Sequence, residues 1–289
     1  MCGIAGILNT NLAASEIIPE GALSAMFDAL AHRDPNGTGA AGPNSPLRLE
    51  RRRLAIFDLS QAADQPMTDR QHGDVLAFNG NICNAKLLRQ ELETHGHVFQ
   101  TQSDSEVILK AYGHWQLDFL SHLRGIFAIA LWDGAKQRLL LARDHLGVKP
   151  LYYAFANGRL VFASEVRAIL ASGLVRRELD PAGLDSYLAY GSVQEPFTLV
   201  NGIRSLPAAS YLCCDQKSLG DANAFWEPDL THLSGSLSSL ADLAADRLRN
   251  AVAMQMTSGD KIGAFLSGGV DSSAIVTLMR QATTAAIHT

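Results

Sequence analysis

Short apolar runs separated by polar turns dominate the first two thirds of the chain. Ile4–Leu8, Val75–Phe78 and Ile126–Trp132 are short and apolar enough for buried strands. Further strands are predicted at Leu54–Asp58, Arg138–Arg143, Leu160–Glu165 and Tyr211–Asp215. Helices are predicted at Glu16–Arg33, Ala85–His95, Val107–Tyr112 and Pro181–Tyr190. Strand hairpins flanked by helices favour a layered α+β sandwich over a parallel α/β sheet.

The pattern changes in the last quarter of the chain. Leu237–Met256 is predicted to be a helix whose leucine-rich stripe packs against a core. A buried strand is predicted at Lys261–Leu266, and it leads through Ser267–Ser273 into a helix at Ala274–Arg280. The sequence therefore predicts a second domain, in which a strand, a glycine-containing loop and a helix follow one another.

Composition restricts the class of protein. A chain of 289 residues favours two domains, and a net charge of −5 argues against an electrostatic nucleic-acid site. The longest apolar run, Ile126–Trp132, is too short to cross a membrane, and no signal-peptide pattern opens the chain. The four cysteines, which include no CxxC, predict neither a disulfide nor a metal site and favour the cytosol. They are Cys2, Cys83, Cys213 and Cys214.

Cys2 is the first candidate for chemistry. It directly follows Met1, so removal of Met1 would leave a free α-amine on the residue that carries the thiol. A model α-amine titrates near ~7.7–8.0 and a model thiol near ~8.5, so the amine can accept the thiol's proton at neutral pH. Nucleophile and general base would then be one residue. The alternative is a buried cysteine at the start of a strand.

Three polar segments each have a plain structural interpretation, and two of them also suit a functional one. Asn79-Gly80 follows a predicted strand, which is typical of a hairpin turn, but an amide beside a glycine N–H also suits an oxyanion hole. Ser103 or Asp104 could simply cap the next helix. The arginines at 51–53 suit either a solvated strand end or a bidentate carboxylate contact.

The loop after Lys261–Leu266 is predicted to bind phosphate. A strand, two glycines and a helix N-terminus present free backbone N–H groups and a helix dipole to an anion. No lysine ends the loop, so it does not match the GxxxxGK[ST] pattern. The alternative interpretation is a tight packing turn.

The order of short motifs along the chain resembles that of class II glutamine amidotransferases, which are N-terminal-nucleophile enzymes. These are Cys-Gly-Ile at the N-terminus, His-Arg-x-Pro, Arg-Leu-x-Ile, Asn-Gly, Ser-Asp-x-Glu, Arg-Asp-x-x-Gly and Ala-Ser-Glu. The resemblance implies a four-layer αββα fold. It also implies Cys2 as nucleophile, Asn79 and Gly80 as oxyanion hole, and Arg53, Leu54, Ile56, Asn79, Gly80, Asn81 and Asp104 as glutamine-binding residues. Among them, Arg53 would bind the α-carboxylate and Asp104 the α-ammonium.

The chain departs from the family pattern at two motifs. His-Arg-Gly-Pro-Asp-Gly is usual where this chain has Asp34 and Asn36 as the third and fifth residues. Asn-Gly-Glu-Ile-Tyr-Asn is usual where this chain has Asn81 and Cys83. The replaced glutamate helps the aspartate bind the ammonium in the family, so weaker glutamine binding is expected here.

The loop after Lys261–Leu266 contains Ser-Gly-Gly-Val-Asp-Ser and resembles the PP-loop of ATP pyrophosphatases. The implied ATP-binding residues are Leu266, Ser267, Gly268, Gly269, Val270, Asp271 and Ser272. The two domains together resemble the glutamine-hydrolysing asparagine synthetases. Implied partners are glutamine, aspartate and ATP with Mg²⁺, and a homodimer is left open.

The predicted organisation is an amidotransferase domain at 2–212, a connector at 213–235 and the beginning of an α/β PP-loop domain at 236–289. The residues that select the amide acceptor are expected beyond Thr289. Three alternatives stay open at this point: amidation of another carboxylate, a protein that only hydrolyses glutamine, and a non-catalytic paralogue.

Overall fold

The computed structural model describes residues 3–10, 18–19, 21–33, 38–41, 47–52, 65–69, 72–215, 218–256 and 262–289. The chain divides into two compact units, Met1–Glu227 and Pro228–Thr289. Each unit is described by itself.

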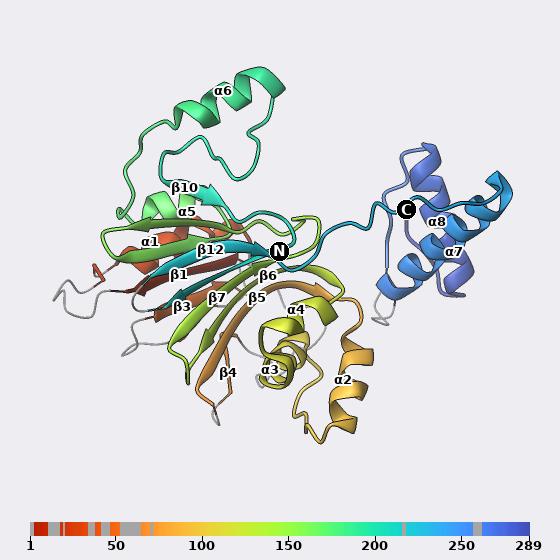
Figure 1. The fold of residues 1–289 in the computed structure, drawn as a ribbon, viewed down its shortest axis with the longest axis horizontal. Helices are drawn as coiled ribbons and strands as arrows, with labels where there is room; N and C mark the ends of the chain where they lie inside the picture. Colours follow the sequence, from red (N-terminus) through yellow and green to blue (C-terminus); the bar gives the residue numbers. More distant parts are fainter. Residues whose placement is uncertain are drawn as a thin grey trace. The chain divides into compact units, whose positions relative to one another are not determined.

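Two antiparallel six-stranded sheets form the centre of the first unit (Figure 1). The first has the order β10-β8-β9-β1-β3-β2 and the second the order β12-β11-β7-β6-β5-β4. The first sheet consists of β1 (Gly3–Asn9), β2 (Thr38–Ala41), β3 (Leu47–Arg52), β8 (Tyr152–Ala156), β9 (Arg159–Ala163) and β10 (Ile203–Ser205). The second consists of β4 (Met67–Asp69), β5 (Asp74–Ile82), β6 (Gly125–Asp133), β7 (Arg138–Arg143), β11 (Ser210–Asp215) and β12 (Leu219–Ala224).

Helices cover the outer face of each sheet. The first sheet carries α1 (Ala22–Ala29), the short turn η1 (Ala31–Arg33) and α5 (Val166–Ala171). The second carries α2 (Ala85–Thr94), α3 (Asp104–Trp115), η3 (Gln116–Asp118) and α4 (Phe119–His122). The predicted four-layer αββα arrangement is therefore confirmed, but the helix predicted at Glu16–Arg33 is shorter: Ile18 and Pro19 are not helical, and α1 begins after the N-cap Gly21 and ends at Ala29.

Strand alternation creates three separate apolar interfaces between these four layers. In β1, Ile4 and Leu8 face the second sheet, whereas Ala5 and Ile7 face α1 and α5. Gly6 lies opposite Phe162 of β9, and a Cβ on Gly6 would come within 2.3 Å of that ring. Glycine is required there because the Phe162 ring fills the space between the sheets.

A further helix, α6 (Pro181–Tyr190), begins as the sequence predicts. Asp180 is its N-cap and accepts hydrogen bonds from the backbone N–H groups of Ala182 and Gly183, at 2.9 and 3.2 Å. Pro181 occupies the first turn, where the missing N–H has no intrahelical partner to lose.

The predicted end of the first domain at Leu212 is too early. β11 continues to Asp215, and β12 follows as the edge strand of the same sheet, so the first unit extends to Glu227. β12 is mostly exposed and has no apolar alternation. Its place is fixed by backbone pairing with β11, which a search for hydrophobic periodicity does not detect.

The second unit contains α7 (Leu237–Gln255) and α8 (Val270–Ala282), which pack against each other. The predicted helix at 237–256 is confirmed, but only Val252 of its stripe is buried, and Leu237 is 86% exposed. The predicted buried strand at Lys261–Leu266 is wrong for the described part: a single parallel bridge joins Gly263 to His288, and Phe265 is fully exposed.

Among the described residues, no helix combines the length and the apolar character needed to cross a lipid bilayer.

Candidate active site

Hydrogen bonds to one neighbouring segment and side-chain packing from another fix the start of β1. Cys2 lies outside the described residues, and Gly3 is the first residue whose position is described. The backbone N–H of Ile4 donates to Oγ of Ser164 at 3.0 Å, and the Ser164 N–H donates back to the Ile4 carbonyl at 2.9 Å. A Cβ on Gly3 would lie 3.3 Å from the side chains of Leu30 and Arg33. The backbone that leads to Cys2 is therefore closely packed.

Glu165 is the centre of a charged cluster beside this point. Its carboxylate pairs with the Arg33 guanidinium, with His32 Nε2 at 2.9 Å and with Arg167 Nε at 2.5 Å. Burial alone would raise the pKa of Glu165, but the hydrogen bonds from Arg33 and its neighbours lower it overall. The cluster joins the His-Arg and Ala-Ser-Glu motifs, which were noted in the sequence but were not predicted as site residues.

Asn79 and Gly80 lie inside a strand, so the hairpin interpretation is wrong. β5 continues through them to Ile82 and pairs with β6 over this whole length. Val75 and Ala77 face the space between the sheets, and strand alternation places Asn79 on that same face. The Asn79 side chain is buried, and its Nδ2 donates to no other group in the part of the chain that the structure describes. A buried amide donor without a partner is what an oxyanion hole requires.

Two glycines allow β5 and β6 to approach closely beside Asn79. A Cβ on Gly80 would lie 2.0 Å from the carbonyl oxygen of Ile126, and a Cβ on Gly125 would lie 2.1 Å from that of Asn81. Both contacts are with backbone, which cannot rotate away. This explains the Gly of the Asn-Gly motif without reference to a turn.

Ser103, not Asp104, caps α3. The Ser103 hydroxyl accepts a hydrogen bond from the Glu106 N–H at 3.3 Å, and the Glu106 carboxylate accepts from the N–H groups of Gln100 and Thr101 at 2.8 and 2.6 Å. The Asp104 carboxylate instead accepts from the Ile82 N–H at 2.8 Å, directly after Asn81. Capping by Ser103 thus leaves Asp104 to face the end of β5.

Burial dominates the ionisation of Asp104. It raises the pKa from 3.8 to about 6, against the opposing effects of the Ile82 N–H and the Arg89 guanidinium. The folded state therefore favours the neutral acid, and this group adds stability as the pH falls below about 6. A carboxylate with so high a pKa is suited to pairing with a cationic ligand group.

We expect glutamine affinity to fall as Asp104 is protonated. If its carboxylate binds the substrate's ammonium, kcat/KM should fall by a further factor of about ten per pH unit below about 6, in addition to any loss caused by protonation of the Cys2 α-amine. Steady-state kinetics between pH 4.5 and 8 measure this. Asp104→Asn should remove the inflection and raise KM at every pH, whereas Asp74→Asn, at the opposite end of β5, should retain it. An unchanged inflection in Asp104→Asn would contradict the assignment.

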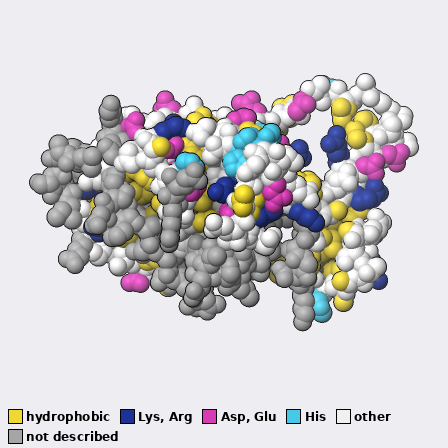
Figure 2. All heavy atoms as spheres, turned by 90° about the horizontal axis from the view of Figure 1, so that it is seen from below, with side chains coloured by type: hydrophobic (Ala, Val, Ile, Leu, Met, Phe, Trp, Pro, Cys, Tyr) yellow, Lys and Arg dark blue, Asp and Glu magenta, His cyan; other side chains and the backbone are white. Residues whose placement is uncertain are grey.

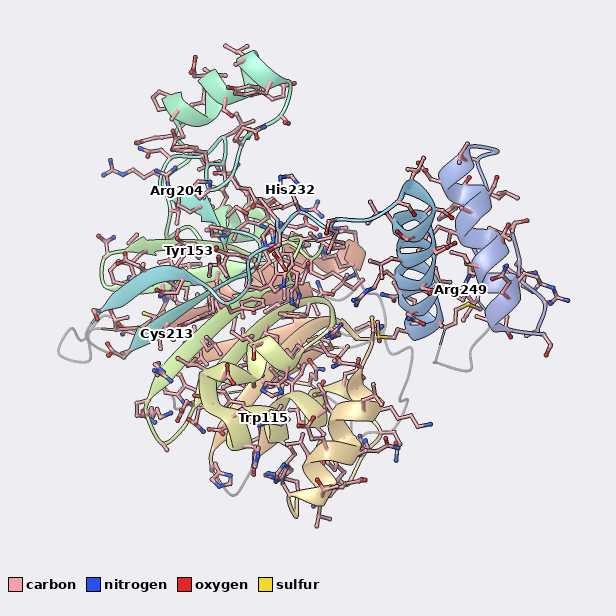
Figure 3. The ribbon with its side chains drawn as sticks, turned by 45° about the vertical axis from the view of Figure 1, so that its right-hand side comes forward. Trp115, Tyr153, Arg204, Cys213, His232 and Arg249 are labelled. Atoms are coloured by element: carbon pink, nitrogen blue, oxygen red, sulfur yellow. The ribbon has the colours of Figure 1, made fainter. Side chains whose placement is uncertain are left out.

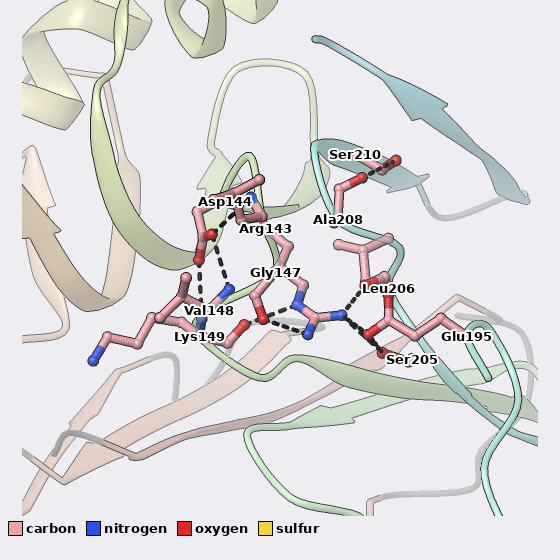
Figure 4. Close-up of polar contacts among 11 residues, drawn as sticks. Arg143, Asp144, Gly147, Val148, Lys149, Glu195, Ser205, Leu206, Ala208 and Ser210 are labelled. Carbon is pink, nitrogen blue, oxygen red and sulfur yellow. Dashed lines mark hydrogen bonds and ion pairs between the residues drawn. The ribbon is translucent and has the colours of Figure 1, made fainter. Parts of the chain in front are cut away.

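Arg143, the last residue of β7, and Asp144 after it make the polar contacts that support this region (Figure 4). Asp144 accepts hydrogen bonds from the N–H groups of Phe127, Leu146, Val148 and Lys149 at 2.9–3.2 Å. The buried Arg143 guanidinium donates to the carbonyls of Gly147, Lys149 and Leu206, to Ser205 Oγ and to Glu195. Phe127 is the β6 partner of Gly80, so this hub fixes the strand against which the Asn-Gly segment packs.

Histidines gather on the outer surface of the helix layer, and Figure 2 shows such a group on the face it displays. His97 Nε2 lies 3.2 Å from His114 Nδ1, and the His95 ring lies 4.6 Å from that of His114. No group of His, Cys, Asp or Glu among the described residues is arranged to hold a metal ion.

The glycine loop of the second unit precedes α8. Gly268 has φ +82°, a conformation that favours glycine, and Gly269 is a helix N-cap without a side-chain hydrogen bond. The Ser267 and Ser272 hydroxyls lie 3.0 Å apart; Ser267 is exposed and Ser272 is half-buried. Leu266 and Val270 are exposed as well. The first N–H groups of α8 therefore have no side-chain cap, which leaves them available to an anion.

The structure brings together Asn79, Gly80, Asn81 and Asp104. Cys2, Arg53, Leu54 and Ile56 lie outside the described residues, as do the departures at Asp34 and Asn36. The assigned roles of all these site residues stay predictions.

The fold and the polar end of β5 together define an amidotransferase of the N-terminal-nucleophile class. A family model described as "Glutamine amidotransferase domain" matches residues 1–226, and the chain belongs to that family. A second model, described as "Asparagine synthase", matches residues 243–289.

The relatives support this assignment. The chain is 33% identical to asparagine synthetase [glutamine-hydrolyzing] 3 of Bacillus subtilis, over 96% of this chain and 45% of that protein. It is 30% identical to amidase chry2 of Gibberella zeae, over 95% of this chain and 42% of that protein. The chain thus spans about half the length of these curated relatives.

A solved structure shares the fold. Glutamine phosphoribosylpyrophosphate amidotransferase from B. subtilis, complexed with ADP and GMP, aligns with a TM-score of 0.57 at 18% identity. The alignment covers 99% of this chain and 65% of that one.

Proposed function

We propose that the protein synthesises asparagine from aspartate and ATP, with ammonia released from glutamine at Cys2. The observation that carries the proposal is the succession of the two family matches, a glutamine amidotransferase domain followed by the start of an asparagine synthase domain. The buried Asn79 side chain on β5, whose Nδ2 has no partner among the described residues, supports the hydrolytic half.

In the hydrolytic half, the Cys2 α-amine accepts the thiol proton and the Cys2 sulfur attacks the side-chain amide carbon of glutamine. The resulting oxyanion accepts hydrogen bonds from Asn79 Nδ2 and the Gly80 N–H, and collapse of the intermediate releases ammonia. Water then hydrolyses the thioester to glutamate. Asp104 and Asn81 bind the α-ammonium, and Arg53 binds the α-carboxylate, while Leu54 and Ile56 lie alongside the substrate.

In the synthetic half, ATP is a substrate and enters with Mg²⁺ on its phosphates. The side-chain carboxylate of aspartate attacks the α-phosphorus, pyrophosphate leaves, and ammonia displaces AMP from the β-aspartyl-AMP intermediate. The uncapped N-terminus of α8 and the two serine hydroxyls fit a phosphate group. Residues 266–272 would hold it.

Amidation of a different carboxylate is the second candidate. It is favoured by the similarity to amidase chry2, which is almost as great as the similarity to the B. subtilis asparagine synthetase. A non-catalytic paralogue, the third candidate, would bind glutamine without hydrolysing it.

The test is a product assay on the full-length protein. With aspartate, ATP and Mg²⁺, we expect asparagine, AMP and pyrophosphate in equal amounts, whether glutamine or ammonia supplies the nitrogen. Glutamine hydrolysis without asparagine, but with pyrophosphate released in the presence of another carboxylate, would favour the second candidate. Glutamine binding without hydrolysis would favour the paralogue.

A further inference from the structure

The two departures from the usual Asn-Gly-Glu-Ile-Tyr-Asn motif touch each other. Asn81 Nδ2 donates a hydrogen bond to Cys83 Sγ at 3.6 Å, within the range for a sulfur acceptor. An amide has a donor end and an acceptor end, so this contact fixes which end faces which way. With Nδ2 directed at the thiol, Oδ1 is the end left for a ligand, and no described residue donates to it.

The backbone around this pair has little freedom. Asn81 pairs with Ile126 of β6, and the Cys83 N–H donates to the Arg124 carbonyl at 2.7 Å. Asn84 binds the segment between α4 and β6 through two hydrogen bonds of 2.9 Å: its Nδ2 donates to the His122 carbonyl, and its Oδ1 accepts from the Arg124 N–H. The orientation of the Asn81 amide is therefore decided by its side-chain rotamer, and Cys83 is the group that selects it.

The Asp104 carboxylate reaches the same place. It accepts a hydrogen bond from the N–H of Ile82, the residue between Asn81 and Cys83. The free amide oxygen and the Asp104 carboxylate, which already accepts from the Ile82 N–H and lies within the electrostatic influence of Arg89, are two acceptors at one strand end. A cation that carries several N–H groups, such as a primary ammonium, matches such a pair.

We propose that Cys83 is a positioning residue for substrate selection: its sulfur holds the Asn81 amide so that Oδ1 accepts from the α-ammonium of glutamine beside Asp104. The inference rests on the proposed glutamine site. The neutral amide and the thiol act as one unit in place of a carboxylate, and the unit selects α-amino acid amides over amides that lack the amino group.

The test compares glutamine with glutaramate, which has the same side-chain amide and carboxylate but no α-ammonium. Cys83→Ala should raise the KM for glutamine about fivefold, or about 1 kcal/mol at 1.4 kcal/mol per factor of ten, with kcat unchanged. Its kinetics with glutaramate should not change. Cys83→Ser, whose hydroxyl also accepts, should restore the KM for glutamine to within about twofold.

Cys213→Ala is the matched control. Cys213, labelled in Figure 3, lies on β11 and packs against the apolar cluster between the second sheet and its helices. Its loss should therefore leave the selectivity unchanged. In an Asn81→Ala background, Cys83→Ala should have no further effect on the KM for glutamine. Additive effects, or an equal loss with both substrates, would overturn the inference in favour of a purely structural role.

Binding to Cys2→Ala protein separates this inference from the proposed function. Calorimetry with glutamine needs no turnover. If this variant binds no glutamine, the proposed function and the inference both fail. If it binds glutamine and the added Cys83→Ala change leaves the affinity unaltered, only the inference fails.

Discussion

Replacing Cys2 with alanine should abolish glutamine hydrolysis, with a loss of about 1000-fold or more. The proposed mechanism has no second nucleophile, and loss of the attacking group in an acyl-transfer enzyme removes nearly all of the chemical acceleration. Glutamate release, measured with a coupled dehydrogenase assay, gives the rate. Intact mass of the active protein should also show that Met1 has been removed, because an amide-linked nitrogen on Cys2 is not basic.

Ammonia-dependent synthesis is the internal control. Full-length Cys2→Ala protein should still form asparagine when ammonia replaces glutamine, since the nucleophile serves only the hydrolytic half. Residual glutaminase activity above about 10% of the wild-type rate would contradict the assignment. So would active protein that retains Met1 quantitatively.

Replacing Asn79 with alanine should lower kcat about 100- to 1000-fold, the usual effect of removing one oxyanion donor. The same change should leave the melting temperature unaltered or raise it. Asn79 is 1% exposed, and its Nδ2 has no partner among the described residues, so alanine removes a buried donor that folding leaves unsatisfied. A substitution that lowers kcat without lowering the melting temperature identifies a functional amide, whereas loss of a structural amide lowers the melting temperature.

Asn84 provides the matched contrast. It is also buried, but its amide donates to the His122 carbonyl and accepts from the Arg124 N–H. Asn84→Ala should therefore lower the free energy of unfolding by about 1–3 kcal/mol, because it leaves these backbone groups unpaired. Thermal unfolding of both variants checks the pair. A lower melting temperature in Asn79→Ala would show that Asn79 supports the fold instead.

Short apolar runs were sufficient to predict the strands of the layered core. The strands at Ile126–Trp132 and Arg138–Arg143 are confirmed almost to the residue, because both faces of each strand are buried against another layer. Capping chemistry was sufficient for α6, where Asp180 and Pro181 mark the start. Local signals succeed where the structure is determined by neighbours in sequence or by burial on both faces.

Three features depend on contacts that the sequence pattern does not encode. Asn79-Gly80 has the composition of a turn but pairs with β6 because Gly125 on the facing strand lets the two backbones approach. β12 has no apolar alternation and is placed mainly by backbone hydrogen bonds to β11, with only Leu219 packing against the core between the sheets. Ser103 and Asp104 both suit a helix cap, and only the tertiary contact between Asp104 and the Ile82 N–H separates their roles.

The Asp144 carboxylate also limits which parts of the first unit can open independently. It holds the N–H of Phe127 on β6 and those of Val148 and Lys149 in the following loop, and its own backbone carbonyl accepts from the Ala209 N–H at 2.8 Å. Opening the loop would therefore release β6 and the entry to β11 in the same step. These segments should behave as one cooperative unit in native-state hydrogen exchange, and β5, which pairs with β6, should share that protection.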